Sequence, residues 1–483
     1  MDCEKAYLVI NPRAGQDMTK LTDVFTILSA AGWDVDNSLV EYGGHAQTLA
    51  TKAIKNEYDL LIGHGGDGTT NELVNAVMQS KNRKATVGVL PGGTANQWPH
   101  EIAMPIDSVQ AALALINSDA RMVDVGRLVV QNVTFPATPQ SEQAVEKQEK
   151  GKKQKKSDQI ENYFLLTAGF GIDASVISHT SKTLKEHVGN LAFDVAAAKE
   201  LPTQHPFQVE IHDISDEHNP KLLWQGETQQ LILGNTRMYS DAIVLTPDAY
   251  IDDGKLDICI ITANSPLTKL QQMTSLVLHH KPDDTTTTYV QGTHMTITLP
   301  ANIGLQLDGS AVDLSDCLND EDREALKQIE DAAKVIITYR FDVLQEVLSV
   351  AIPRTYDNTL FSHAPQKGQE QVPTASDSQE PAQSISQEQV NAALGQGKQI
   401  TVQGTTPNPE KRNGYIIAGT TRKESTGDIK PVALRVNAET RLYKRTGESV
   451  QATTLAALQS GVVIVVEGKE NKHGVIQATG IIL

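Results

Sequence analysis

Cysteine is scarce in this chain, and no stretch of it has the composition of a membrane span. The three cysteines, Cys3, Cys259 and Cys317, lie far apart and form neither a CxxC pair nor an even-numbered framework. This argues against a disulfide scaffold and gives no metal signature, so we expect a reducing compartment. No apolar run reaches the length of a transmembrane helix, and the strand-like run at 6–10 begins too early to leave room for a signal peptide. These absences predict a cytoplasmic protein.

Positive charge is also scarce. Lysine and arginine number 42 against 59 acidic residues, so the formal net charge is −17. Because nucleic-acid phosphates are bound largely by cationic side chains, this balance argues against non-specific nucleic-acid binding. It also disfavours adhesion of the whole chain to anionic membrane, so we expect any contact with a membrane to be local and transient.

The length of 483 residues predicts more than one domain. Strand and helix patterns alternate in residues 1–123, with apolar runs at 6–10, 58–62 and 86–90 and helical periodicity at 20–31, 46–56 and 72–78. Strands separated by helices of this length imply a parallel, doubly wound sheet. Residues 1–123 are therefore predicted to form an α/β lobe.

Residues 124–353 are predicted to form a mainly antiparallel β-sandwich lobe. Strand-like runs separated by turn residues lie at 163–168, 207–211, 229–234, 256–262 and 294–299, and only 182–199 has a clear helical pattern. A lysine-rich tract with interleaved glutamates lies within 136–158. We interpret it as a disordered insertion in preference to a contact for anionic lipid.

The C-terminal part of the chain is predicted to be a separate unit. Residues 354–404 are predicted to be a linker that few contacts cross, because 358–398 are rich in Gln, Ser, Pro and Ala and poor in aliphatic residues. Residues 405–483 contain short strand-like runs between polar turns and predict a small all-β domain, either a barrel or a sandwich. This domain contains no cluster of catalytic residue types, and its sequence does not identify a partner.

The most informative segment is GHGGDGTTNE at 63–72, between a predicted buried strand and a predicted helix. Glycines let backbone N–H groups approach an anion closely, and a helix N-terminus adds a positive dipole. Thr69 and Thr70 add hydroxyl donors, whereas Asp67 in an exposed anion-binding loop indicates a bound cation or a polar catalyst. The segment matches neither GxxxxGK[ST] nor GxGxxG, which argues against a P-loop kinase and a dinucleotide-binding turn.

Further segments accompany this loop: NPRAG at 11–15, LPGGTAN at 90–96, TAGFGIDA at 167–174, GN at 234–235 and IDDGKLD at 251–257. Together they resemble the diacylglycerol kinase and sphingosine kinase superfamily of lipid kinases, over roughly residues 5–353. NAD kinases and 6-phosphofructokinases share GGDGT, but the segments after residue 160 favour the lipid kinases. The resemblance implies an NAD kinase-like or phosphofructokinase-like α/β lobe that binds ATP, a β-sandwich second lobe, and an active site between them.

The resemblance also implies roles for individual residues. Nucleotide contacts fall on Asn11, Gly66, Asp67, Gly68, Thr69, Thr70, Asn71, Glu72 and Thr94, with Asp67 also catalytic. Asp253 and the backbone carbonyls of Tyr250 and Lys255 match a divalent-cation site, and Asp124 matches an acid near it. Oxygen ligands of this kind suit Mg²⁺. An ordinary turn is the alternative interpretation of the DDG sequence at 252–254.

Two positions depart from the family pattern. Gln97 replaces an Asp, and Ser310 replaces a Glu that the resemblance implies as general base for the lipid hydroxyl. Serine does not take up a proton at neutral pH without a partner, and a general base contributes about 10²–10⁴-fold to rate. Either the enzyme is slow, or Asp67 or Asp308 accepts the proton, although we expect Asp308 to be structural. Val40, in place of a threonine that contacts ATP in some members, is a milder change.

Three functions remain open. The favoured one is an ATP- and Mg²⁺-dependent kinase for the hydroxyl of diacylglycerol, ceramide or a sphingosine-like base, taken from a membrane surface. The second is a catalytically weak relative that binds nucleotide or lipid as a regulator, which Ser310 and Gln97 motivate. NAD kinase is the third, and it would not explain the segments at 167–174 and 251–257. No nucleic-acid partner is expected, and a homodimer is left open.

Overall fold

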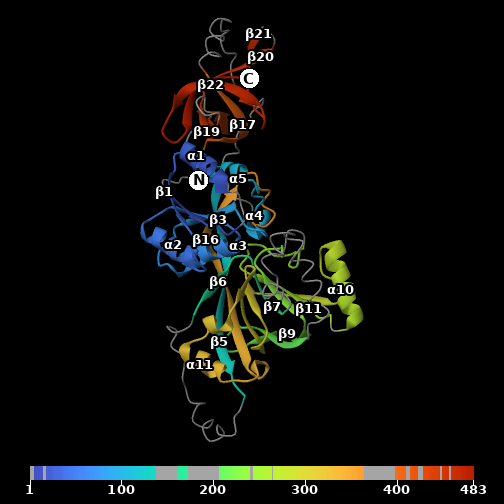
Figure 1. The fold of residues 1–483 in the computed structure, drawn as a ribbon. Helices are drawn as coiled ribbons and strands as arrows, with labels where there is room; N and C mark the ends of the chain where they lie inside the picture. Colours follow the sequence, from blue (N-terminus) through green and yellow to red (C-terminus); the bar gives the residue numbers. More distant parts are fainter. Residues whose placement is uncertain are drawn as a thin grey trace.

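The computed structural model describes residues 5–14, 18–136, 160–171, 206–239, 243–263, 265–363, 397–408, 414–422, 428–446, 449–455 and 458–483. The first lobe is built on parallel strands in the order β2-β1-β3-β4 (Figure 1). Its elements are β1 (Lys5–Ile10), α1 (Leu21–Ala30), β2 (Asp34–Leu39), α2 (His45–Lys55), β3 (Leu60–Gly65), α3 (Asp67–Gln79), β4 (Thr86–Pro91), α4 (Gln97–Glu101) and α5 (Ser108–Ile116). This is the α/β lobe that the sequence predicts.

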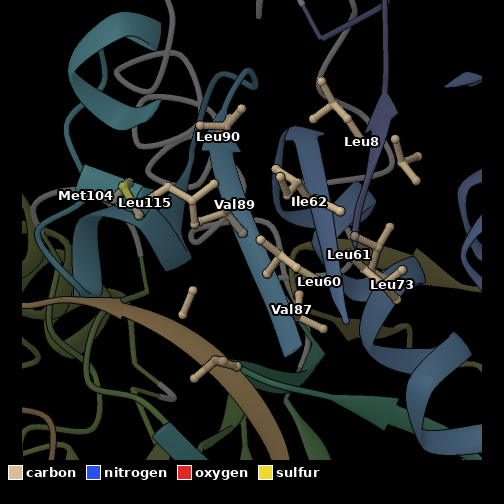
Figure 2. Close-up of a cluster of buried hydrophobic side chains, with 14 of the residues drawn as sticks. Leu8, Leu60, Leu61, Ile62, Leu73, Val87, Val89, Leu90, Met104 and Leu115 are labelled. Carbon is tan, nitrogen blue, oxygen red and sulfur yellow. The ribbon is translucent and has the colours of Figure 1, made fainter. Parts of the chain in front are cut away.

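Glycines in the central strands let the helices pack closely on this sheet. An added Cβ on Gly63 of β3 would lie 3.4 Å from Leu73 of α3, and one on Gly88 of β4 would lie 2.9 Å from Leu115 of α5. Figure 2 shows both leucines beside the buried side chains of these strands. Because β3 and β4 are buried along their whole length, the loops at their carboxyl ends start from a rigid base.

Two long antiparallel strands, β5 (Ser118–Thr134) and β16 (Ile336–Pro353), connect the first lobe to the second. β16 pairs in parallel with β4 through Val350 and Val87 and then carries the sheet on through β13, β8 and β9. The second sheet has the order β12-β11-β10-β7-β14-β15. The two sheets pack face to face, with the ring of Phe170 in β7 lying 5.1 Å from that of Tyr339 in β16. This is the predicted sandwich.

The strands of the second lobe have the following bounds: β6 (Asn162–Phe164), β7 (Thr167–Gly171), β8 (Phe207–Asp213), β9 (Lys221–Thr228), β10 (Gln230–Gly234), β11 (Leu256–Ile261), β12 (Thr287–Gly292), β13 (His294–Pro300), β14 (Leu305–Leu307) and β15 (Ser310–Val312). Their inward-facing apolar side chains form one buried cluster between the sheets. The short β14–β15 hairpin places its turn at the border with the first lobe, where it meets α3.

Two helices of the second lobe contradict the expectation that only 182–199 is helical. α10 (Pro266–His279) starts with a capping box at Ser265, and α11 (Asp320–Lys327) starts with Asn319 as its side-chain cap. The sequence pattern missed them because their apolar faces are weakly marked: α11 has no fully buried side chain, and α10 buries Gln272 and Ser275 while three of its leucines face outward. Residues 182–199 and 137–158 lie outside the described residues, and no described helix is long and apolar enough to cross a membrane.

The C-terminal domain is a small barrel. Five strands in the order β19-β18-β17-β22-β23 close on themselves because β23 also pairs with β19, and β20 and β21 form a hairpin beside β23. The strands are β17 (Lys398–Pro407), β18 (Tyr415–Arg422), β19 (Ile429–Val436), β20 (Arg441–Thr446), β21 (Ser449–Ala452), β22 (Val463–Glu470) and β23 (Val475–Ile482). β17 begins within the range 354–404 that the sequence analysis assigned to a linker.

The barrel packs on the first lobe, so the expectation that few contacts cross the linker is wrong. Ile416, Ala418, Ala433 and Val475 belong to the same buried cluster as the core of the first lobe. The Arg435 Nε donates to the carbonyl of Ala30 at the end of α1, over 2.6 Å. Linker composition missed this because most of the contacting strands lie beyond it, and because its own end, where Gln403 accepts a hydrogen bond from Gln110 of α5, belongs to β17.

Candidate active site

The glycine loop after β3 lies against the loop after β4. An added Cβ on Gly92 would lie 2.9 Å from the Cα of Gly65, and one on Gly66 would lie 3.2 Å from the Cα of Gly93. Side chains at these positions would therefore push the two loops apart. Gly66 is the N-cap of the 13-residue helix α3 and provides no side-chain cap, so the N-terminus of α3 keeps backbone donors for an anion.

Asp67 does not lie in a freely exposed loop, as the sequence suggested. Its half-buried carboxylate accepts backbone hydrogen bonds from Gln97 (2.9 Å) and Trp98 (3.0 Å) at the start of α4. Burial raises the pKa of Asp67, and these hydrogen bonds oppose that rise. The carboxylate therefore joins the glycine loop to the loop after β4. Sequence alone could not reveal this, because the donors are backbone groups thirty residues away.

Of the other residues expected to contact the nucleotide, some lie beside the glycine loop and one, Glu72, points away from it. Asn11 lies beside the loop, and its Nδ2 donates to Thr69 Oγ1 over 3.1 Å, while Thr70 is buried and Thr94 is exposed. Glu72 instead turns toward α2, where its two carboxylate oxygens accept from the backbone N–H groups of Gly44 (3.2 Å) and Gln47 (3.1 Å). Glu72 thus caps α2 and holds the glycine-containing 41–44 loop beside α3.

Asn71 connects the first lobe to the second. Its Nδ2 donates to the carboxylate of Asp308 (2.8 Å) and to the carbonyl of Tyr163 (3.0 Å). Asp308 is 2% exposed and has a positive φ of 46°, and its carboxylate also accepts the backbone N–H groups of three successive residues. Those residues are Leu165, Leu166 and Thr167. Burial raises the pKa of Asp308 to about 6, and the four hydrogen bonds oppose that rise.

Ser310 begins β15 directly after this turn. Its side chain is exposed, and its Oγ would lie 3.3 Å from a Cβ added to Gly68. The hydroxyl therefore faces the first turn of α3 across the border between the lobes. Gly309, with φ of +72°, has open space around its Cα. The structure thus brings the sequence-predicted residues Gly66, Gly68, Thr69, Asn71 and Ser310 together.

The turn at 250–255 lies beside the two long strands β5 and β16 that connect the lobes. The Asp124 carboxylate accepts from the backbone N–H groups of Gly254 (2.6 Å) and Glu346 (2.8 Å), and Asp253 accepts from the N–H of Lys255 (3.0 Å). Gly254 is required here, because its φ is +75° and a Cβ would collide with Gln345. Tyr250 is the first residue of the turn, and its ring lies under the guanidinium of Arg237 at 4.6 Å.

Negative charge accumulates at this turn. Burial raises the pKa of Asp124 to about 6, and the nearby charges of Asp253 and Asp252 add to the rise. Burial likewise raises the pKa of Asp257 to about 6, and one of its oxygens is buried without a partner among the described residues. In the described part of the chain, no three His, Cys, Asp or Glu side chains form a metal-binding group. A cation here would therefore need backbone carbonyls as further ligands.

Sequence reasoning missed the role of α4 as a second bridge between the lobes. The Nε2 of Gln97, one of the departures from the family pattern, donates to the carbonyl of Met238, and the carboxylate of Glu101 accepts the N–H of Met238 over 2.6 Å. Burial raises the pKa of Glu101. No local motif signals this contact, because it joins positions more than 130 residues apart.

Comparison with known proteins supports both lobes separately. Residues 5–128 match the diacylglycerol kinase catalytic domain, and residues 167–315 match the YegS C-terminal NAD kinase beta sandwich-like domain. A diacylglycerol kinase of Staphylococcus saprophyticus is 28% identical over 260 residues, which cover 53% of this chain and 73% of that protein. A diacylglycerol kinase of Bacillus subtilis is 26% identical over 309 residues, which cover 63% of this chain and 89% of that protein.

Comparison with solved structures agrees with the similarity in sequence. A crystal structure of a Bacillus anthracis protein assigned to the diacylglycerol kinases superposes with a TM-score of 0.53 at 19% identity, covering 74% of this chain and 98% of that one. The two matched regions follow the order of the two lobes and together span more than half of the chain. The chain is therefore a kinase whose first lobe is similar to the diacylglycerol kinase catalytic domain and whose second lobe is similar to the YegS C-terminal domain.

Proposed function

We propose that this kinase transfers the terminal phosphate of ATP to the hydroxyl of diacylglycerol or of a related lipid such as ceramide or a sphingosine-like base. The observation that carries the proposal is the close approach of Ser310 Oγ in the second lobe to Gly68 in the first turn of α3. The open N-terminus of α3 offers a place for phosphate, and the exposed hydroxyl of Ser310 marks a place for a second substrate directly opposite it. Transfer through a loose transition state needs this kind of positioning more than it needs covalent chemistry.

The first lobe supplies groups that fit a nucleotide phosphate. Asn11 and Thr69 hold polar side chains beside the glycine loop, and Gly66 and Gly93 let the two loops approach closely next to the uncapped N-terminus of α3. In the proposal, Asp67 keeps the two loops in register through its hydrogen bonds to α4. The role of Glu72 is to fix the 41–44 loop, and it acts on the nucleotide through that loop.

The turn at 250–255 fits a divalent cation in its donor chemistry. Asp253 offers a half-buried carboxylate, and Tyr250 and Lys255 offer backbone carbonyls on either side. The pKa of Asp124 is raised mainly by burial, and the charges of Asp253 and Asp252, which a cation would compensate, add to the rise. Mg²⁺, when bound, would neutralise charge in the phosphate network. Asp124 holds the turn itself through Gly254 N–H, so its proposed role is to shape this site.

Ser310 and Asp308 favour a second candidate, a catalytically weak relative that binds nucleotide or lipid as a regulator. The Asp308 carboxylate accepts four hydrogen bonds and is buried, so it is poorly placed to take a proton from a lipid. The Ser310 hydroxyl faces the first turn of α3, where the lipid hydroxyl is proposed to bind, but a serine side chain is not a general base. The proposed enzyme would therefore be slow unless a solvent molecule accepts the proton.

An assay with radiolabelled ATP tests the two candidates. The full chain is supplied with Mg²⁺ and with diacylglycerol, ceramide, sphingosine or undecaprenol in mixed micelles, with NAD as a comparison substrate. Label in a lipid phosphate, above a no-enzyme control, supports the kinase and names the lipid class. Binding of ATP without label in any lipid supports the regulatory relative, and label in NAD alone contradicts both.

A further inference from the structure

Helix α10 buries two polar side chains and turns three of its leucines outward. On the inner face, Gln272 and Ser275 are buried, and Gln272 Oε1 accepts hydrogen bonds from Asp283 N (2.9 Å) and Thr286 Oγ1 (3.0 Å). Leu276 packs against a small buried cluster at the second sheet, formed by Ile232, Ile243, Leu245, Cys259, Ile261 and Ala263. Among the described side chains, Gln272 therefore adds polar contacts to the apolar contact that Leu276 makes on the inner face.

The outer face carries a row of leucines. Leu267, Leu270 and Leu278 are 66%, 55% and 67% exposed, which makes them the three most exposed leucines among the residues the structure describes. Their spacing of three and eight residues places them on one side of the helix, with Thr274 between them. Figure 1 shows α10 at the outer edge of the second lobe, away from the barrel. Single exposed leucines are common, but a row on one helix indicates a contact surface.

The charge of α10 identifies the kind of partner. Between Ser265 and Lys281 there is no Asp or Glu, although the whole chain has a net charge of −17. The same stretch contains Lys269, His279, His280 and Lys281, and the side chain of Lys281 is 58% exposed and 3.4 Å from Asp284. Leucines on one face with basic residues at the ends are typical of helices that lie in the surface of an anionic bilayer.

We propose that α10 is a membrane-docking helix that inserts Leu267, Leu270 and Leu278 into an anionic lipid surface. The proposal rests on the proposed function, since a kinase for a membrane lipid must reach its substrate at that surface. A second copy of the chain fits the leucine face of α10 less well than a lipid surface does. Stable protein interfaces bury about 800 Å² on each partner and favour aromatic residues and arginine at their centre, whereas this face offers three leucines.

Vesicle binding of the full chain tests the proposal. Wild type is compared with the triple variant Leu267→Gln, Leu270→Gln and Leu278→Gln, on vesicles of equal parts phosphatidylglycerol and phosphatidylcholine. The matched control is Leu222→Gln, because Leu222 on β9 is also an exposed leucine, at 48%. The triple variant should bind at least tenfold more weakly with an unchanged melting temperature, and the control should bind like wild type. Equal binding by all three proteins would overturn the proposal, as would equal binding of wild type to pure phosphatidylcholine vesicles.

A second measurement separates this proposal from the proposed function. Turnover is measured on a short-chain diacylglycerol dissolved in buffer and on a long-chain diacylglycerol in the same vesicles. The triple variant should match wild type on the dissolved substrate and lose at least tenfold in kcat/KM on the vesicles. Equal loss on both substrates would overturn the docking role. If wild type phosphorylates neither substrate, the proposed function fails, and vesicle binding alone then decides the role of α10. A dimer that the triple substitution dissociates, with vesicle binding unchanged, would assign the leucines to a second copy and overturn the proposal.

Discussion

The side-chain amide of Asn71 donates a 2.8 Å hydrogen bond to the carboxylate of Asp308, and this bond joins the first turns of α3 to the β14–β15 turn. Asn71 lies one helical turn after Gly68, and Asp308 lies two residues before Ser310. The positions at which the two substrates are proposed to meet are therefore held by the hydrogen bond between the half-buried Asn71 and the buried Asp308. The relative placement of Gly68 and Ser310 depends on Asp308.

Asp308→Ala should lower the free energy of unfolding by about 3 kcal/mol or more, because it leaves three backbone N–H groups and an amide without their acceptor in a buried place. Denaturant unfolding followed by circular dichroism measures this. Asp313→Ala is the matched control, since that exposed carboxylate accepts a backbone bond from Ser315 in the following loop. Equal small losses for both variants would show that Asp308 does not hold the turn.

Ser310→Glu should raise lipid turnover at least tenfold at saturating ATP. The new carboxylate would stand where the proton of the lipid hydroxyl is released, and a general base contributes about 10²–10⁴-fold. Because Ser310 is exposed, the melting temperature should change little. Ser310→Gln controls for volume and should not gain turnover. The idea is refuted if Glu and Gln behave alike, or if wild type already turns over at about 1–100 s⁻¹, as typical kinases do.

Asp67→Ala should abolish lipid turnover and also lower stability by about 1 kcal/mol, because its carboxylate caps the start of α4. Asp107→Ala is the matched control: Asp107 accepts backbone bonds from Val109 and Gln110 as the N-cap of α5. It should show a similar stability loss with turnover retained. Full turnover in Asp67→Ala would remove this loop from the active site.

Asp257→Asn should stabilise the protein at pH 7 by about 1–3 kcal/mol. Burial raises the pKa of Asp257 from 3.8 to about 6 in the folded state, so the folded protein holds a proton that the unfolded chain has already released. The resulting stabilisation is present below pH 3.8 and is lost as the pH rises through about 6. The variant lacks this loss, so its unfolding free energy should fall less between pH 4 and pH 6.5.

Unfolding in Mg²⁺-free buffer over that pH range provides the measurement. Asp124 and Asp308, whose pKa values are likewise raised to about 6, should also lower the unfolding free energy as the pH rises. Part of the pH dependence of the unfolding free energy should therefore remain in the variant. A variant that is less stable than wild type at pH 7, with the same slope, would mean that the Asp257 carboxylate is compensated by a partner in the folded protein.

Local patterns predicted much of the first lobe. The predicted strand at 86–90 and the predicted helix at 46–56 agree with β4 and α2 within a residue, because apolar periodicity records which faces are buried. The glycine loop was found for a related reason, since its residue types are needed for close backbone approach. The role of Glu72 could not be predicted from the sequence. Its carboxylate caps α2, and no residue near Glu72 in the sequence indicates that partner.

Patterns failed where burial is polar or where partners are distant. α10 was missed because its buried face carries Gln272 and Ser275 while three of its four leucines face outward. The contact of the barrel with α1 depends on Arg435 and Ala30, which only the folded chain brings together. In the candidate site, the residue types at Asp67 and Asp308 drew attention to them, whereas their hydrogen-bond partners appeared only in three dimensions.

The most direct test compares wild type with Gly68→Val in transfer of labelled phosphate from ATP to diacylglycerol. A Cβ on Gly68 lies 3.3 Å from Ser310 Oγ, so a valine fills the space in which the two substrates are proposed to meet. We expect wild type to label the lipid in the presence of Mg²⁺, and Gly68→Val to lose at least a hundredfold in rate with an unchanged melting temperature. Equal rates for the two proteins, or a wild type that labels no lipid, would contradict the account.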